Sequence, residues 1–129
     1  MKFLAFVVLA LGAEFNWAGS PCSGVWRTEN QQADIQFVGC GEGYVCGVVV
    51  RTSKEFSMAN LGDTLIQRAH CAENGTRFSG GRIRTNTMTA EFNAVIDSRD
   101  CLNVEITKFL FSKRQRWKKV GLSRCSGAF

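Results

Sequence analysis

The chain has very little histidine, with one residue, His70, in a length of 129. A single imidazole excludes mechanisms that use two histidines as general acid and general base. The length excludes a second domain, since domains contain about 100–200 residues, and it excludes dinucleotide-binding folds built from several βαβ units. Apolar residues make up 45% of the chain, so it belongs to the globular class and not to the disordered one.

Long apolar runs are also absent, with one short exception at the N-terminus. Residues 3–13 are continuously apolar after the basic start Met1-Lys2, whereas a membrane span needs about 20 such residues. This length and position are typical of a secretory signal peptide. We predict a signal peptide over residues 1–20, cleaved after Ala13 or Ala18, and one domain over residues 21–129. The protein is then expected in the periplasm or outside the cell, and the alternative is a buried N-terminal helix.

Six cysteines follow this leader: Cys22, Cys40, Cys46, Cys71, Cys101 and Cys125. An even number of cysteines in a small exported domain is typical of a disulfide framework. No Cys-x-x-Cys pair is present, and Cys40 and Cys46 stand too far apart for a zinc knuckle. The sequence therefore predicts disulfides, no metal site and no cofactor.

Apolar and polar residues alternate along most of the mature chain, which is the pattern of half-buried strands. The clearest strand covers residues 87–96, and residues 101–107 repeat its pattern. The segment between them, from Asp97 to Asp100, is rich in turn-forming residues. These two strands are therefore predicted to form a hairpin.

Further strands are predicted over residues 33–38, 44–51, 77–84 and 109–119. Three glycines between the first two of them suit a tight connection. Residues 52–60 predict either a loop or one helical turn. Seven or eight short strands joined by turns predict an all-β fold, either an antiparallel up-and-down barrel or a sandwich.

Tryptophan motifs stand near both ends of the mature chain. Gly24-Val25-Trp26 opens the first strand, and Arg116-Trp117-Lys118-Lys119 closes the last. Small barrels of the lipocalin type open with a similar Gly-x-Trp, and a cation from their last strand lies across the indole, which contributes about 0.5–2 kcal/mol. This resemblance implies a lipocalin-like barrel of about eight strands, in which Lys119 lies over Trp26.

The order of several motifs is more specific. The succession is Gly24-x-Trp26-x-Thr28, Cys40-Gly41, Cys46-Gly47-Val48-Val49, Phe78-x-Gly80-Gly81-Arg82-Ile83 and Gln115-x-Trp117-x-Lys119-Val120. It resembles the bacterial exported family catalogued as domain of unknown function 2147, over nearly the whole mature chain. The resemblance implies a small barrel without a defining enzymatic activity. Residues 53–60 and 84–91 depart from the family pattern, so the chain resembles a divergent member.

The placement of the cysteines on these strands predicts how they pair. A Cys40–Cys46 bond would close the tight corner between two strands. A Cys22–Cys125 bond would join the ends of the first and last strands, which leaves a Cys71–Cys101 bond.

Four aromatic residues are candidates for a ligand-binding interior: Trp26, Phe109, Phe111 and Trp117. An eight-stranded barrel either holds a small ligand or is filled by its own side chains. Because the chain has many large side chains, a filled interior is favoured. A small apolar ligand remains the partner that an open interior would take.

The net charge of +5 concentrates on the last strand. Arg114, Arg116 and Lys118 alternate along it and share one face, and Arg82 and Arg84 lie on another strand. This basic patch would contact phosphate, anionic envelope lipids or an acidic partner, or it would serve only to prevent edge pairing between sheets. No aromatic platform is interleaved with it, so no specific nucleic acid is expected.

Catalytic arrangements have little support in the sequence. His70 and Cys71 are adjacent on a strand, so their side chains point to opposite faces and cannot form a nucleophile–base pair. A ribonuclease would need His70, a carboxylate such as Glu91 or Glu105, and an arginine. We therefore predict an exported, monomeric, non-catalytic binding barrel. The alternatives are an inhibitor-type protein-binding barrel and a secreted basic ribonuclease.

Overall fold

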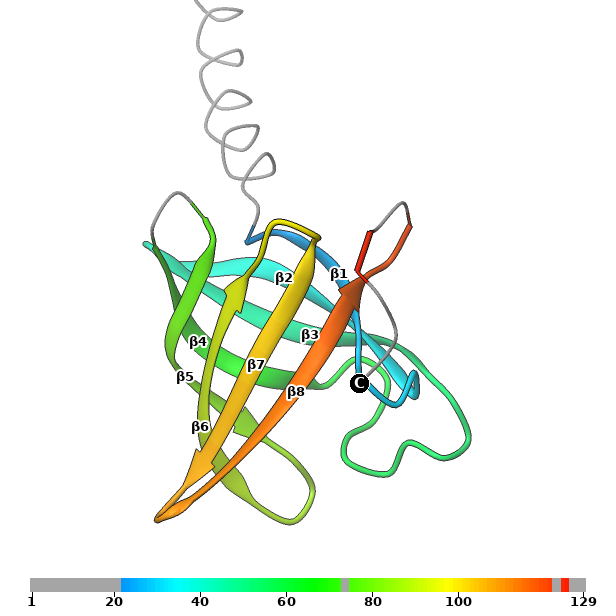
Figure 1. The fold of residues 1–129 in the computed structure, drawn as a ribbon. Coiled ribbons are helices and arrows are strands. Elements are labelled where there is room, and N and C mark those ends of the chain that lie inside the picture. Colours follow the sequence, from blue (N-terminus) through cyan, green and yellow to red (C-terminus); the bar gives the residue numbers. More distant parts are fainter. Residues whose placement is uncertain (1–21, 73–74, 122–123, 126–129) are drawn as a thin grey trace, which may run out of the picture.

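Eight antiparallel strands form a closed barrel in the computed structural model, which describes residues 22–72, 75–121 and 124–125 (Figure 1). In chain order the strands are β1 (Gly24–Arg27), β2 (Ala33–Gly41), β3 (Tyr44–Thr52), β4 (Thr64–Ala72), β5 (Arg77–Arg84), β6 (Thr89–Ile96), β7 (Cys101–Lys108) and β8 (Phe111–Lys119). Each strand pairs with its neighbours in the sequence, and β1 pairs with β8. This confirms the up-and-down barrel and excludes the sandwich. The predicted signal peptide lies outside the described residues.

Most of the predicted strands are confirmed to within a few residues. The prediction for residues 77–84 coincides with β5. β6 begins at Thr89, two residues later than predicted, because the Thr85 hydroxyl accepts hydrogen bonds from the backbone N–H of Thr87 and Met88 and holds them in a turn. Between β3 and β4 the chain forms turns and bends, so the loop alternative holds for this segment.

The strand β4 is the element that alternation did not reveal. Leu65 and Ile66 are consecutive and both buried, and Arg68 has a φ of 46°, in the left-handed region. The pairing of β4 with β3 contains register shifts at the same level. Such bulges move the inward-facing positions by one residue along the strand. The apolar pattern therefore changes phase within the strand, and a period of two is no longer visible.

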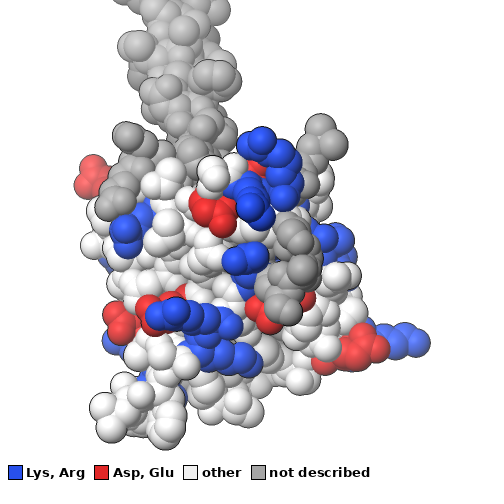
Figure 2. All heavy atoms as spheres, viewed as in Figure 1, with Lys and Arg blue, Asp and Glu red and all other residues white. Residues whose placement is uncertain are grey.

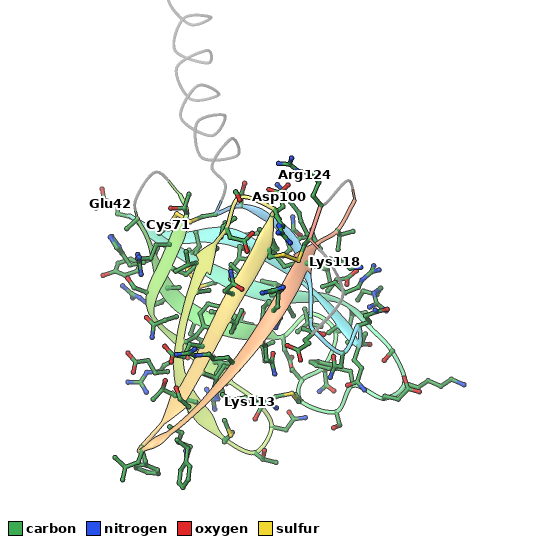
Figure 3. All side chains as sticks on the ribbon, in the orientation of Figure 1. Glu42, Cys71, Asp100, Lys113, Lys118 and Arg124 are labelled. Carbon is green, nitrogen blue, oxygen red and sulfur yellow. A yellow bond between two sulfur atoms is a disulfide. The ribbon has the colours of Figure 1, made fainter. Side chains whose placement is uncertain are left out.

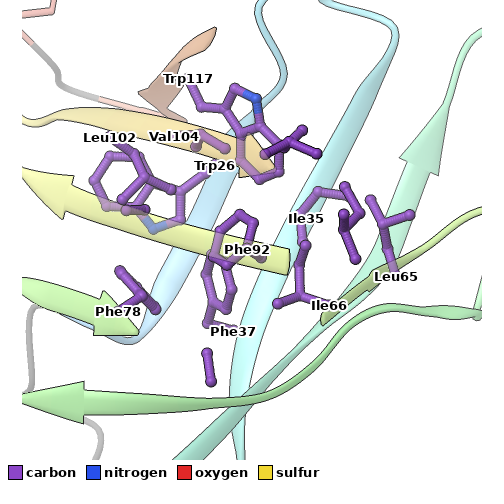
Figure 4. Packing of buried hydrophobic residues seen from close by; sticks show 14 of the residues in the cluster. Trp26, Ile35, Phe37, Leu65, Ile66, Phe78, Phe92, Leu102, Val104 and Trp117 are labelled. Atoms are coloured by element: carbon purple, nitrogen blue, oxygen red, sulfur yellow. The ribbon is translucent and has the colours of Figure 1, made fainter. Parts of the chain in front are cut away.

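Aromatic rings fill the middle of the barrel. The Phe37 and Phe78 ring centroids are 4.6 Å apart, and Phe92 lies 6.3 Å from Phe78 and 6.0 Å from Trp117 (Figure 4). All four side chains are buried, and they come from β2, β5, β6 and β8. Aromatic pairs of this kind contribute about 0.5–1.5 kcal/mol beyond the burial of their surface. The Phe37–Phe78 and Phe92–Trp117 contacts therefore link strands that are not neighbours in the sheet.

The packing leaves no room for an added methyl group at Gly47 on β3. A Cβ at this position would lie 2.8 Å from Ile35 Cγ2 and 2.9 Å from Ile66 Cγ1. Side chains from β2 and β4 thus close over the glycine from both sides. This is the close packing that is normal in protein interiors, where adding even one methylene group disturbs the neighbouring side chains. The barrel is filled by its own side chains, as favoured from the sequence.

The meander places all six cysteines at one end of the barrel, which we call the cysteine end. In an up-and-down barrel the odd strands start and the even strands finish at the same end. Cys22, Cys46 and Cys101 stand near the starts of odd strands, and the other three cysteines stand near or beyond the finish of even strands. We call the opposite end, where β7 turns into β8, the tip end.

The three disulfides are Cys22–Cys71, Cys40–Cys46 and Cys101–Cys125. The predicted Cys40–Cys46 bond is present, whereas the predicted Cys22–Cys125 and Cys71–Cys101 bonds are wrong. After β8 the chain folds back, so that Cys125 Sγ lies 4.0 Å from the Trp117 carbonyl oxygen, next to the first residue of β7. Cys22 instead pairs across the barrel mouth with Cys71, near the end of β4.

Candidate functional site

The hairpin between β7 and β8 ends in three exposed apolar side chains. Phe109, Leu110 and Phe111 are 86%, 97% and 80% exposed, and they are the most exposed large apolar side chains among the described residues. We call residues 109–111 the apolar tip. Contiguous exposed apolar side chains of this kind mark interaction surfaces more often than single ones do.

Two of the four residues predicted to line the interior therefore lie outside it. Trp26 and Trp117 are each 1% exposed within the packed core, but Phe109 and Phe111 are at the surface, and the prediction for them is wrong. Phe109 sits in the turn itself, and Phe111 pairs with Lys108 at the outermost position of the hairpin. Alternation predicts which face of the sheet a residue lies on. It does not predict that the hairpin extends beyond the core, where both faces are exposed to water.

The apolar tip is held by a well-bonded hairpin. The Thr107 and Ser112 hydroxyls, on opposite strands next to the tip, are 3.1 Å apart. The Ser112 hydroxyl donates to Glu105 Oε2 at 3.0 Å, and Lys108 Nζ donates to the Thr89 carbonyl oxygen on β6 at 3.1 Å. These bonds fix the direction in which the tip projects from the barrel.

Phe109 adopts a backbone conformation that glycine prefers. Its φ is 56°, in the left-handed region, where a bulky side chain is uncommon. Strain of this kind persists when the surrounding structure imposes it, and it is concentrated at functional segments. Lys108 Nζ lies 5.4 Å from the centre of the Phe109 ring, within the range of a cation–π contact.

Exposed cations surround the apolar tip on β5, β7 and β8. We call them the basic collar: Arg82, Arg84, Lys108, Lys113 and Arg114. Two carboxylates lie among them, with Glu91 opposite Arg82 and Glu105 opposite Arg114, whose nearest nitrogen–oxygen distance is 3.8 Å. In Figure 2 a band of basic side chains borders the uncharged protrusion at the lower left, where Figure 1 places the β7–β8 turn.

The predicted basic patch is thus divided between two places. Arg82, Arg84 and Arg114 belong to the basic collar, whereas Arg116 and Lys118 lie further toward the cysteine end. Arg116 donates through its backbone N–H to Glu29 Oε1 at 2.8 Å, and its Nε lies 3.4 Å from Asn103 Oδ1. Figure 3 shows the separation along β8, with Lys113 near the tip end and Lys118 near the cysteine end.

Barrel closure positions Lys119 beside Trp26. The two residues are partners in the β1–β8 pairing, and Lys119 Nζ lies 5.9 Å from the centre of the indole. The Trp26 side chain is buried under this contact. The contact stabilises the pairing of the first strand with the last. Because Trp26 is buried, its indole is not accessible to a ligand.

A charged cluster around the turn between β1 and β2 was not identified from the sequence. Asp34 on β2 is buried, and Arg27 binds it in a bidentate manner, with Nε–Oδ1 and Nη2–Oδ2 distances of 2.8 Å and 3.1 Å. Arg51 Nε on β3 forms an ion pair with Oδ2 at 3.0 Å. Burial raises the pKa of Asp34, but the hydrogen bonds from Arg27 and Arg51 and the charges of both arginines outweigh it, so the pKa lies below its ordinary value. The cluster ties three consecutive strands together.

The residues of the ribonuclease alternative do not converge. His70 on β4 is exposed and pairs with Ser79, and its ring lies 5.9 Å from that of Tyr44. Glu91 pairs with Arg82, three residues further along β5, which corresponds to about 10 Å along a strand. Cys71 forms a disulfide and is not a free nucleophile. Glu105 lies on β7, with β5 and β6 between it and His70, so neither candidate carboxylate lies beside the imidazole.

The part of the chain that the structure describes holds no cluster of three or more histidine, cysteine, aspartate or glutamate side chains suited to a metal ion. Within residues 22–72, 75–121 and 124–125, no helix has the length and apolar character to cross a membrane. Comparisons with protein-family models, with curated proteins and with solved structures give no match for this chain.

Proposed function

We propose that this protein is an exported, non-catalytic binding module that contacts its partner through the apolar tip. The observation that carries the proposal is the exposure of Phe109, Leu110 and Phe111 on a hairpin that the barrel holds in place. Covering these side chains would remove a large apolar surface from water, which is the main favourable term in most associations. The three disulfides support an oxidising compartment, outside the cytoplasm.

The packed interior argues for a partner outside the barrel. Carriers of small apolar molecules enclose a cavity of about 300–1,000 Å³. Here the corresponding space is occupied by the rings of Phe37, Phe78, Phe92 and Trp117. A ligand in the interior would have to displace these side chains, whereas a partner at the tip displaces only water.

A pocket on another protein is one candidate for this partner. Exposed aromatic side chains on a rigid support are typical of the few residues that dominate protein interfaces. An inhibitor-type barrel in the cell envelope would insert the apolar tip into such a pocket, with acidic residues around its rim. The resemblance to domain of unknown function 2147 stays a prediction, and it accords with a non-catalytic role.

The proposed function can be tested with dodecylphosphocholine micelles, which offer an apolar surface without net charge. We expect the amide NMR signals of residues 107–112 to shift on addition of micelles, because the apolar tip enters them. The indole N–H signals of Trp26 and Trp117 should stay in place. Shifts of these indole signals with an unchanged tip would show that the barrel is a carrier and would contradict the proposal.

A matched pair of variants controls for nonspecific binding of exposed apolar side chains to micelles. Leu61 lies in the connection between β3 and β4, at the same end of the barrel but outside the apolar tip, and is 64% exposed, so Leu61→Ser removes a comparable apolar side chain from a different loop. We expect Leu110→Ser to abolish most of the micelle-induced shifts and Leu61→Ser to leave them unchanged. Equal losses in both variants would mean that the tip has no special role.

A further inference from the structure

We propose that the partner of the apolar tip is an anionic lipid bilayer. The apolar tip enters the boundary between the headgroups and the acyl chains, and the basic collar contacts the lipid phosphates. This inference rests on the proposed function, because it names the surface that the tip binds.

The tip suits shallow insertion into a bilayer. Apolar side chains of interfacial anchors are buried about 5–10 Å into the boundary between headgroups and acyl chains. The backbone of the hairpin is paired as far as Lys108 and Phe111, so only a two-residue turn brings unpaired peptide groups toward the apolar layer. Two of the three tip side chains are aromatic, and the bordering Lys108 has a stem long enough to reach back to the headgroups.

One cation of the basic collar, Lys113, stands at the height of the lipid phosphates when the tip is inserted. Lys108 is the partner of Phe111, and Lys113 follows Phe111 by two residues on β8. At about 3.4 Å per residue, Lys113 stands about 7 Å from Phe111 along the strand. The polar layer on each side of the hydrocarbon core is about 5–8 Å thick. An inserted tip therefore places Lys113 within the headgroup layer.

Lys113 is also free to bind an external anion. No side-chain hydrogen bond or ion pair joins it to another residue in the described part of the chain, and its side chain is exposed. The carboxylates Glu91 and Glu105 lie beside Arg82 and Arg114, respectively. The collar as a whole has more cations than carboxylates, so its field attracts negative charge.

The distribution of the charges favours a bilayer over a pocket. The cations lie on three strands around a projecting turn, so no single small anion can contact all of them (Figure 1). Anionic headgroups move laterally and can gather around such a projection, and each cation near the surface of an anionic bilayer contributes to the attraction. A bilayer thus supplies the apolar layer and the phosphates in the spatial order that the tip and the collar require.

The test uses the exported protein with its disulfides intact and vesicles of phosphatidylglycerol or of phosphatidylcholine. Co-sedimentation should show binding to phosphatidylglycerol at low salt, weaker binding to phosphatidylcholine, and a loss of the difference at high salt. Leu110→Ser should lower the partition coefficient about tenfold or more on phosphatidylglycerol, since a buried leucine is lost. Lys113→Gln should lower it about fivefold on phosphatidylglycerol and hardly at all on phosphatidylcholine.

Two control variants lie in the connection between β3 and β4, at exposed positions of the same barrel end but outside the apolar tip and the basic collar. Leu61→Ser and Lys54→Gln remove the same kinds of side chain and should leave vesicle binding unchanged. All variants have the same N-terminus as the wild type, so differences between them report on the substituted position. Equal losses in the tip and control variants would overturn the proposal.

The vesicle and micelle experiments separate the two proposals. If the wild type does not sediment with phosphatidylglycerol while micelles still shift residues 107–112, the bilayer proposal is overturned and a protein pocket becomes the partner. If the tip responds to neither vesicles nor micelles, the proposed function fails as well. Binding that depends on Leu110 and Lys113 in the expected way supports both.

Discussion

The two ends of the barrel are held together by different kinds of bond. At the cysteine end, three disulfides close segments whose cysteines are 49, 24 and 6 residues apart in the sequence. At the tip end, the described residues are joined by hydrogen bonds and ion pairs, such as those of Glu105 with Ser112 and Arg114. The tip end also carries the left-handed Phe109, which costs stability, and exposed apolar side chains, which contribute none because folding does not bury them. Covalent bonds at one end thus accompany a strained, exposed segment at the other.

The largest expected effect comes from opening the longest disulfide. In the Cys22→Ala/Cys71→Ala double variant we expect the free energy of unfolding to fall by about 4 kcal/mol, because the unfolded chain regains the entropy of a long loop. The Cys40→Ala/Cys46→Ala variant, which opens a short loop, should lose only about 2 kcal/mol. Urea unfolding of both variants measures the difference. Equal losses of unfolding free energy in the two variants would show that the Cys22–Cys71 bond stabilises the protein no more than the short Cys40–Cys46 bond does.

A smaller effect is expected from acid, which protonates the two carboxylates whose pKa is lowered in the folded state, Asp34 beside the β1–β2 turn and Asp97 at the cysteine end. The pKa of Asp34 is lowered in the folded state, so its contribution to stability is present above the ordinary aspartate value of about 3.9. That contribution is lost as the pH falls through the lower, folded-state pKa. Asp97 acts in the same direction: burial raises its pKa, but hydrogen bonds from the Arg99 and Cys101 backbone and from Asn103 outweigh burial and lower it.

Asp34→Asn should reduce the free energy of unfolding at neutral pH by about 2 kcal/mol, since it leaves two arginines without their carboxylate. Unfolding measured as a function of pH should also show a shallower decline below about pH 4 in this variant than in the wild type. A variant with the wild-type acid dependence would show that the Arg27–Asp34–Arg51 cluster does not stabilise the fold.

The smallest expected effect tests the strain at the tip. Phe109→Gly should raise the free energy of unfolding by about 0.5–1 kcal/mol, because glycine adopts a positive φ without steric cost. The same variant should bind micelles and phosphatidylglycerol vesicles less well than the wild type. Leu110→Gly is the control: Leu110 has no positive φ, so this change should not stabilise the protein. A loss of stability in Phe109→Gly would contradict the idea that function maintains the strain.

Much of the barrel was predictable because most strands are half-buried. Where one face of a strand meets the core and the other meets water, apolar and polar residues alternate, as in β6 and β7. The strand β4 escaped prediction because a bulge at Arg68 shifts its inward-facing positions partway along. The hairpin pattern of residues 109–119 indicated a strand, but it contained no information about where the core ends along that strand.

The candidate site was less predictable than the fold. Phe109 and Phe111 were singled out as aromatic residues near the last strand, but they were expected inside the barrel. Their exposure depends on where the core ends along β7 and β8, which is a property of the closed barrel. The grouping of Arg84 with Lys108 also required the structure, because both lie near Thr89 although 24 residues separate them in the sequence.

The sequence by itself determined the local features of this protein. Alternation specified most of the strands, the even number of cysteines indicated disulfides, and close spacing indicated the Cys40–Cys46 bond. The tertiary structure decided the features that depend on contacts between distant segments: the two longer disulfides, the filled interior, the Asp34 cluster and the apolar tip with its basic collar. The physical reason is that side-chain alternation depends on immediate neighbours, whereas height along the barrel and pairing across its mouth depend on how all eight strands close.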